Sequence, residues 1–170
     1  MMNIAQQRQI EHTIAQLYND AKYDRVRMAK AMTSSLFRAI QPADFHNVYL
    51  SISKKQGEDL SRLVQDANIK NIVEFGTSFG ISTLFLALGA IATKGHIITT
   101  ELIPSKAERA VENFRTAGVD DLIEVRVGDA METLSAHRAP IDLLFLDGWK
   151  DLYLPLFRML EPNFHGKTLI

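Results

Sequence analysis

Four acidic residues stand where short apolar runs of this sequence end: Glu74, Glu101, Asp129 and Asp147. The runs alternate with helix-like stretches, which predicts parallel strands, and open α/β sheets bind ligands in the crevice at the carboxyl ends of such strands. Carboxylates there could attract an ammonium or sulfonium group, accept hydrogen bonds from ribose hydroxyls or an adenine amino group, or bind a cation. Any one of them could instead cap the helix that follows. Four together favour a ligand site.

A glycine turn follows the first of these runs, in the stretch NIVEFGTSFGIS at 71–82. Gly76 and Gly80 can adopt positive φ and allow close approach of the backbone to a ligand. A carboxylate at Glu74 would repel a pyrophosphate at the helix N-terminus but attract the charged groups of S-adenosylmethionine. Ser78 also occupies the middle glycine position of the dinucleotide fingerprint G-x-G-x-x-G. The turn therefore favours S-adenosylmethionine over a dinucleotide.

The elements that must position these residues follow from hydrophobic periodicity. Helices are expected at 10–18, 25–40, 58–67, 81–92, 104–117, 131–136 and 152–160. Strands are expected at 72–74, 96–100, 122–127 and 141–146, and a fifth begins at 167. The pattern predicts an α/β, Rossmann-like, doubly wound and mainly parallel sheet. We expect residues 1–56 to form a helical cap on the substrate side and residues 57–170 to form the domain that binds S-adenosylmethionine.

Length and composition exclude several classes of protein. The 170 residues suit one domain, and a net charge of −1 predicts no nucleic-acid partner and no binding to an anionic membrane. The absence of cysteine excludes disulfides, a thiolate nucleophile and a cysteine-based zinc site. Residues 75–93 carry no charge, but their Gly, Ser and Thr content and the flanking strands favour a buried helix over a membrane span. We expect a cytoplasmic protein.

From about Lys54 to its end, the chain resembles the class I S-adenosylmethionine-dependent O-methyltransferases of the catechol and caffeoyl-CoA type. Three stretches carry the resemblance: VEFGTSFGISTLFLA, GDAMETL and IDLLFLDGWKDLYLP. The third is the most specific. The resemblance implies a seven-stranded, mainly parallel sheet, S-adenosylmethionine as methyl donor, and a small molecule with a catechol-like hydroxyl as acceptor.

The resemblance also assigns the donor-binding positions. The methionine end of the donor falls on Glu74, Gly76, Thr77, Ser78, Gly80 and Ser82. Glu101 corresponds to the residue that holds the ribose, and it lies about twenty residues past Gly80, the spacing at which a carboxylate reaches ribose hydroxyls. The adenine falls on Gly128, Asp129 and Ala130.

The third stretch implies the reaction chemistry. Asp147 matches a metal ligand that also belongs to the catalytic site and borders the donor, Lys150 matches the catalytic base, and Trp149 matches an aromatic residue next to donor and acceptor. Gly148 stands where the catechol type often has His or Ala, so stacking on adenine from this position is lost. Magnesium would chelate two vicinal hydroxyls of the acceptor, and Lys150 would take a proton from one of them. Taken alone, Asp147 could be a helix cap, Trp149 a packing residue and Lys150 a solvated lysine.

The end of the sequence departs from the family pattern. The chain stops at Ile170, before the position at which an Asp-Asn pair would supply the other metal ligands. We therefore expect either a fragment, truncated after the fifth strand, or a protein without the metal site. An apolar edge at the fifth strand would favour a homodimer or poor solubility.

Three alternatives stay open. The chain could be a metal-independent methyltransferase for a nitrogen or a sugar hydroxyl. It could also be a catalytically inactive S-adenosylmethionine-binding domain that acts as an interaction module. A nicotinamide-dependent oxidoreductase is disfavoured by Glu74 and Ser78.

Overall fold

The computed structural model describes residues 4–23 and 51–170. The predicted helix at 25–40 lies outside these residues. Within them, five parallel strands form one sheet in the order β3-β2-β1-β4-β5. The strands are β1 (Asn71–Phe75), β2 (His96–Glu101), β3 (Ile123–Val127), β4 (Ile141–Leu146) and β5 (Phe164–Leu169). The predicted α/β, Rossmann-like fold is confirmed.

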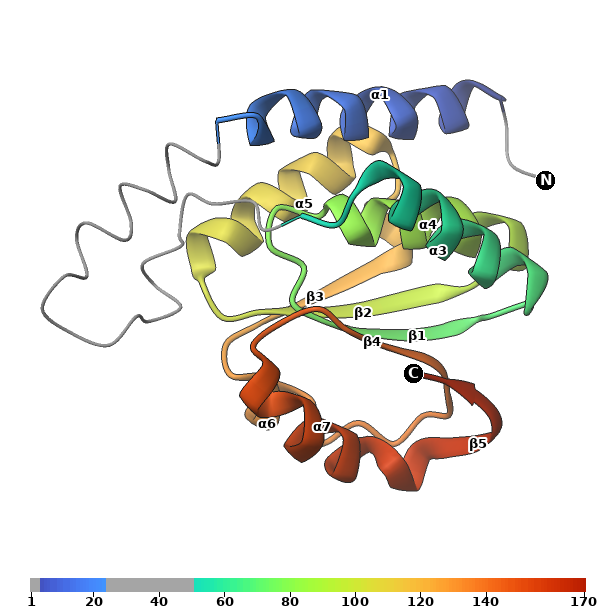
Figure 1. Ribbon diagram of the computed structural model, residues 1–170, viewed down its shortest axis with the longest axis vertical. Helices are drawn as coiled ribbons and strands as arrows, with labels where there is room; N and C mark the ends of the chain where they lie inside the picture. Colours follow the sequence, from blue (N-terminus) through green and yellow to red (C-terminus); the bar gives the residue numbers. More distant parts are fainter. Residues whose placement is uncertain (1–3, 24–50) are drawn as a thin grey trace, which may run out of the picture.

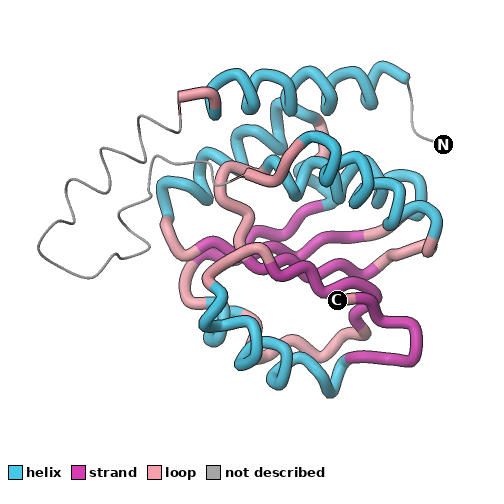
Figure 2. Tube along the Cα trace, viewed as in Figure 1, coloured by secondary structure: helices cyan, strands magenta, loops and turns pink. Residues whose placement is uncertain are grey.

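Helices cover both faces of this sheet (Figure 1). One face carries α1 (Ile4–Ala21), α3 (Lys54–Asp66), α4 (Ile81–Thr93) and α5 (Pro104–Ala117). The other face carries α6 (Ala130–Thr133) and α7 (Tyr153–Leu160). Short 3₁₀ segments lie at Asp120–Leu122, Lys150–Leu152 and Glu161–Asn163. Figure 2 shows the strands between these two groups of helices, with α1 outermost on its side.

The order of the strands places a switch point at β1 and β4. From β1 the chain moves outward through β2 to β3, and it then returns across the sheet to pair β4 with the other side of β1. Connections therefore leave β1 and β4 in opposite directions, which opens a crevice between their carboxyl ends. The fold thus positions the ends of these two strands, with those of β2 and β3 beside them, around one site.

The helix α4 is buried around almost its whole circumference, as the uncharged stretch at 75–93 predicted. It packs closely on α3 because two glycines remove side chains from the contact. A Cβ at Gly57 would lie 2.2 Å from the Phe85 ring, and a Cβ at Gly89 would lie 2.6 Å from Val64. No helix in the described parts of the chain is both long enough and apolar enough to span a membrane.

The N-terminal helix α1 packs on the sheet-covering helices. Ile10, Ile14 and Leu17 are buried in the same apolar cluster as Phe114 of α5. Gln9 Nε2 also donates to the Thr116 carbonyl at 2.6 Å. A separate cap formed by residues 1–56 stays a prediction, because residues 24–50 lie outside the described part.

Three elements begin several residues earlier than the sequence pattern indicated. The helix α1 begins at Ile4 instead of residue 10. The helix α3 begins at Lys54 because Ser53 and Gln56 form a capping box, so the start predicted at Glu58 was wrong. The strand β5 begins at Phe164 instead of Lys167. Phe164 pairs with Ile141, and its ring lies 5.4 Å from that of Phe157.

The strand β5 is the last in the sheet order among the described residues. Its pairing with β4 is irregular, since Ile141 faces Phe164 but Leu143 faces Leu169. Ile170 is exposed beyond it. Homodimer formation through this edge stays a prediction.

Candidate active site

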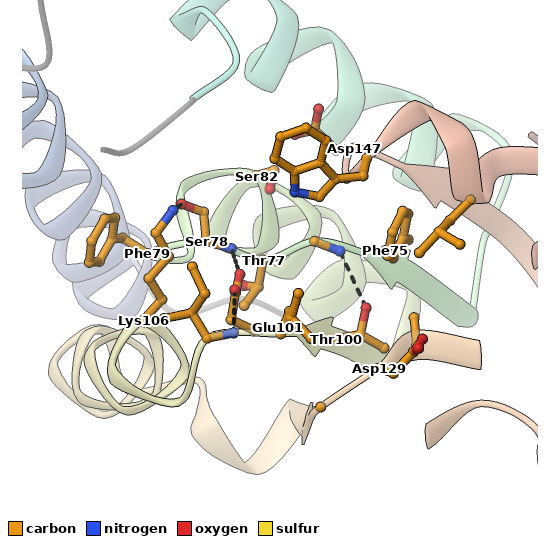
Figure 3. Close-up of a pocket in the computed structure, with 18 of the residues that line it drawn as sticks. Phe75, Thr77, Ser78, Phe79, Ser82, Thr100, Glu101, Lys106, Asp129 and Asp147 are labelled. Atoms are coloured by element: carbon orange, nitrogen blue, oxygen red, sulfur yellow. Dashed lines mark hydrogen bonds between the residues drawn. The ribbon is translucent and has the colours of Figure 1, made fainter. Parts of the chain in front are cut away.

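A cavity of about 580 Å³ lies at the carboxyl ends of the strands. Most of its wall comes from four segments at the ends of strands: residues 75–79, 100–103, 128–130 and 147–152. These segments are far apart in the sequence, and the parallel sheet brings them together. Figure 3 shows their side chains around the cavity. All four predicted strand ends therefore border one space.

The turn after β1 needs glycine at two places, for two reasons. Gly76 has φ 96°, and a Cβ on it would lie 3.0 Å from Gly148 Cα and 3.1 Å from the Asp147 carbonyl oxygen. Gly80 has φ 95°, and a Cβ on it would lie 2.5 Å from the Phe114 ring. Gly76 borders the cavity and lets β1 approach β4, whereas Gly80 lets the turn pack on α5. A contact between Gly80 and the donor stays a prediction.

Glu101, at the end of β2, is held by backbone donors on both carboxylate oxygens (Figure 3). Its Oε2 accepts from the Ser78 N–H at 2.9 Å, and its Oε1 accepts from the Ile103 N–H at 2.9 Å. Burial raises the pKa of this carboxyl, against the effect of these hydrogen bonds. A carboxylate has about four lone-pair sites, so Glu101 can still accept from a ligand hydroxyl. The geometry is therefore that of a fixed acceptor on the cavity wall.

Lys106 is a cavity residue that sequence reasoning missed. Although charged, it is buried, and its Nζ donates to Ser78 Oγ at 3.3 Å and lies 5.2 Å from the centre of the Phe79 ring. Its positive charge favours the ionised form of Glu101. A lysine in the first turn of a helix is usually solvated, so the sequence held no signal for this position.

Glu74 lies behind the turn, fully buried, and its side chain is not among those that border the cavity. Its carboxylate accepts from Ser82 Oγ at 2.6 Å, from Thr99 Oγ1 at 2.6 Å and from Thr83 Oγ1. Burial raises its pKa to about 7; the three hydroxyls oppose this rise and the charge of Asp147 adds to it. Glu74 thus ties β1 to α4 and β2. Its predicted attraction of the donor's charged groups stays a prediction.

Thr77 and Ser82 come from the turn and from the start of α4. Both border the cavity, and both are buried. Thr77 Oγ1 lies 2.6 Å from Thr83 Oγ1, so it extends the hydroxyl network around Glu74. Their predicted contact with the methionine end of the donor is compatible with this placement.

The segment after β3 carries the predicted adenine positions, and all three border the cavity. The Gly128 N–H donates to the Glu101 carbonyl at 2.9 Å, which joins this segment to the end of β2. Asp129 caps α6, since its Oδ1 accepts from the Met131 N–H at 2.8 Å. The cap uses one of the two carboxylate oxygens. Ala130, the first residue of α6, is buried.

The segment after β4 carries the predicted reaction chemistry. The Asp147 N–H donates to the Phe75 carbonyl at 2.9 Å, and burial raises the pKa of the Asp147 carboxyl to about 6. Trp149 is 41% exposed and Lys150 begins a 3₁₀ segment; both border the cavity. The carboxyl of Asp147, the ring of Trp149 and the amine of Lys150 therefore come from one segment on the β4 side of the cavity.

The described residues do not fit a magnesium site at Asp147. Within 4–23 and 51–170, no group of three or more His, Cys, Asp or Glu side chains is placed to hold a metal ion. A hard cation takes about six oxygen ligands, and within the described residues Asp147 belongs to no such group of side chains that could supply them. Metal binding by Asp147 stays a prediction.

Comparison with known proteins decides the family. Residues 29–163 match a protein-family model described as O-methyltransferase. The chain belongs to the O-methyltransferase family. This confirms the resemblance inferred from the three sequence stretches.

Curated relatives in this family are longer than this chain. A catechol O-methyltransferase of Niastella koreensis is 35% identical over 132 residues, which cover 75% of this chain and 57% of that protein. A catechol O-methyltransferase of Mycobacterium tuberculosis is 39% identical over 103 residues, which cover 60% of this chain and 46% of that protein. The chain thus spans about half the length of the curated relatives it matches.

Solved O-methyltransferase structures share the fold. The O-methyltransferase of Bacillus cereus, in complex with S-adenosylhomocysteine (SAH), superposes with a TM-score of 0.67 at 26% identity. The match covers 89% of this chain and 70% of that one. The family and fold are therefore established, whereas the role of each site residue stays a prediction.

Proposed function

We propose that this chain is the S-adenosylmethionine-binding part of a methyltransferase that acts on a hydroxyl of a small molecule. The observation that carries the proposal is Glu101, which is fixed by two backbone N–H groups in the wall of the cavity at the switch point. A carboxylate held in this way is suited to two vicinal hydroxyls of a ribose. Family membership and the SAH complex of the Bacillus cereus relative support the same donor.

The cavity has a place for each part of the donor. Gly76, Thr77 and Ser82 border the side proposed for the methionine end, next to the turn. Glu101 accepts from the ribose hydroxyls, and the segment 128–130 borders the adenine. When bound, S-adenosylmethionine supplies an electrophilic methyl group on a sulfonium. The residues around it fix its position and exclude water.

Lys150 is the proposed base for the acceptor. It lies on the same segment as Trp149, on the β4 side of the cavity, and it takes a proton from the acceptor hydroxyl, so that the oxygen becomes nucleophilic. Trp149 and Leu102 are exposed on the rim of the cavity. Their apolar surfaces offer contact to the ring of a catechol-like acceptor. Holding acceptor and donor in line is the main contribution of such a site.

The donor site is tested by calorimetric titration of S-adenosylmethionine and SAH into the chain and into Glu101→Gln. The exchange leaves one of the two backbone N–H groups without its acceptor and removes the charge, so we expect the binding free energy to weaken by about 1–3 kcal/mol, which is roughly five- to 150-fold in affinity. Glu108→Gln removes an exposed carboxyl of α5 and serves as the control. A folded wild-type chain that binds neither compound would refute the proposal.

The base is tested by Lys150→Met, with release of SAH measured in the presence of catechol. We expect methyl transfer to fall about 10²- to 10⁴-fold, with the affinity for SAH unchanged. Lys167→Met, at the exposed edge of the sheet, is the matched control. Donor binding without turnover of any hydroxyl acceptor would favour the inactive interaction module instead.

A further inference from the structure

Phe75 and Gly148 are complementary in shape on the wall of the cavity. Phe75 is the last residue of β1, and Gly148 follows the end of the neighbouring strand β4. A Cβ on Gly148 would lie 2.5 Å from the Phe75 ring, which is closer than real contacts allow. Gly148 lies outside the positive-φ region that Gly76 and Gly80 adopt. The ring, and not the backbone conformation, therefore excludes a side chain at 148.

The Phe75 ring is held in one orientation. The ring of Tyr153, in α7, meets it edge to face, with centroids 6.3 Å apart and planes at 82°. Ala130, at the start of α6, belongs to the same buried apolar cluster. Phe75 is 8% exposed and borders the cavity. The ring is therefore a fixed part of the wall.

The position of the ring relates it to the adenine end of the cavity. Figure 3 shows Phe75 between the segments that carry Asp129 and Asp147. One of these segments supplies the residues proposed to border adenine, and the other supplies Gly148, where no side chain is available for stacking. An aromatic ring between the two suits the apolar face of a purine, whose polar edge would meet Asp129.

We propose that Phe75 forms the aromatic wall of the purine subsite, in the place that a side chain at position 148 would otherwise fill. The inference rests on the proposed function and adds to it a residue that contacts the base of the donor. Phe75 and Gly148 then act as a pair. A larger residue at 148 requires a smaller one at 75.

The first test is titration of SAH and of adenosine into Phe75→Leu, which keeps an apolar side chain but removes the ring. We expect affinity for both compounds to fall about three- to tenfold, by the same factor, since both carry the base. Phe157→Leu is the matched control, because its ring packs on Phe164 outside the cavity wall. Thermal unfolding of each variant confirms that it is folded.

The second test is a double-mutant cycle. Gly148→Ala should weaken SAH binding by displacing the ring, whereas Gly166→Ala should not, because a Cβ there meets nothing within 4 Å. Phe75→Leu should weaken binding in the wild type but strengthen it in Gly148→Ala, since the smaller side chain makes room. A change of sign of this kind shows that the two positions are energetically coupled, as the close fit of the ring against Gly148 predicts.

The outcomes are distinct. A wild-type chain that does not bind SAH refutes the proposed function together with this inference. A wild-type chain that binds SAH, with equal affinity in folded Phe75→Leu and Gly148→Ala, refutes the inference alone. If the variants fail to fold, NMR on the wild-type complex decides. Contacts between adenine protons and the Phe75 ring protons, assigned through Tyr153, support the inference, and their absence overturns it.

Discussion

Replacing Glu74 by Gln should change how the stability of the protein depends on pH. Glu74 is fully buried, and three hydroxyls are its only side-chain hydrogen-bond donors within the described residues. Burial raises its pKa from 4.5 to about 7. Between these values the folded protein keeps the proton that the unfolded chain has released. The free energy of unfolding therefore falls as pH rises through this window.

The magnitude follows from the size of the rise. One pKa unit corresponds to about 1.36 kcal/mol, so the rise from 4.5 to about 7 corresponds to a loss of about 3 kcal/mol between pH 4.5 and pH 7. Gln stays neutral and removes this contribution. It also replaces one acceptor oxygen by an amide donor, which costs about 1 kcal/mol at every pH. We expect Glu74→Gln to be slightly less stable than wild type at pH 4.5 and more stable at pH 8.

Urea unfolding followed by circular dichroism at pH 4.5, 6, 7 and 8 measures the difference between the two proteins. Glu132→Gln, which removes an exposed carboxyl in α6, controls for the change in net charge. The difference between Glu74→Gln and wild type should rise by about 3 kcal/mol across the series. Parallel profiles would show that Glu74 titrates in the folded protein as it does in the unfolded chain, and would refute the rise in its pKa.

Three further changes test the fold. Gly80→Ala should destabilise the chain by about 2–5 kcal/mol, because strain at positive φ adds to a clash with Phe114. Gly118→Ala, with φ 68° and a Cβ in ordinary contact with Gln9 at 3.8 Å, should cost only about 1 kcal/mol, and chemical denaturation compares the two variants. Leu144→Ala removes a fully buried side chain of β4 and should lower the free energy of unfolding by about 2–5 kcal/mol in the same measurement. A loss under about 1 kcal/mol would contradict the packing of Leu144 in the core. Asp142→Ala removes the acceptor of two backbone N–H groups at the start of β1. We expect the free energy of unfolding to fall by about 1–3 kcal/mol and both amides to exchange hydrogen faster. Unchanged exchange would contradict these hydrogen bonds.

Much of the site was predictable because it depends on local sequence and on a general rule of topology. Apolar runs that end on Glu101 and Asp147 indicated strand ends, and parallel strands place their carboxyl ends at one edge of the sheet. The turn from Gly76 to Gly80 was recognisable from its glycines alone. The start of β5 was not predictable from the sequence. The first half of this strand contains the residues His165, Gly166 and Lys167, which are not typical of a strand, and it is recognised only by its pairing with β4.

Sequence alone determined the order of the elements, the resemblance to the family and the strand ends that surround the cavity, since these depend on periodicity, spacing and motif. Only the tertiary structure decided which way each of these side chains faces. Glu74 and Phe75 are neighbours on one strand, yet strand geometry directs the acid into the hydroxyl network under α4 and the ring toward the cavity and α7. The burial of Lys106 and the fit of Phe75 against Gly148 likewise arise from contacts between distant segments, which no local pattern encodes.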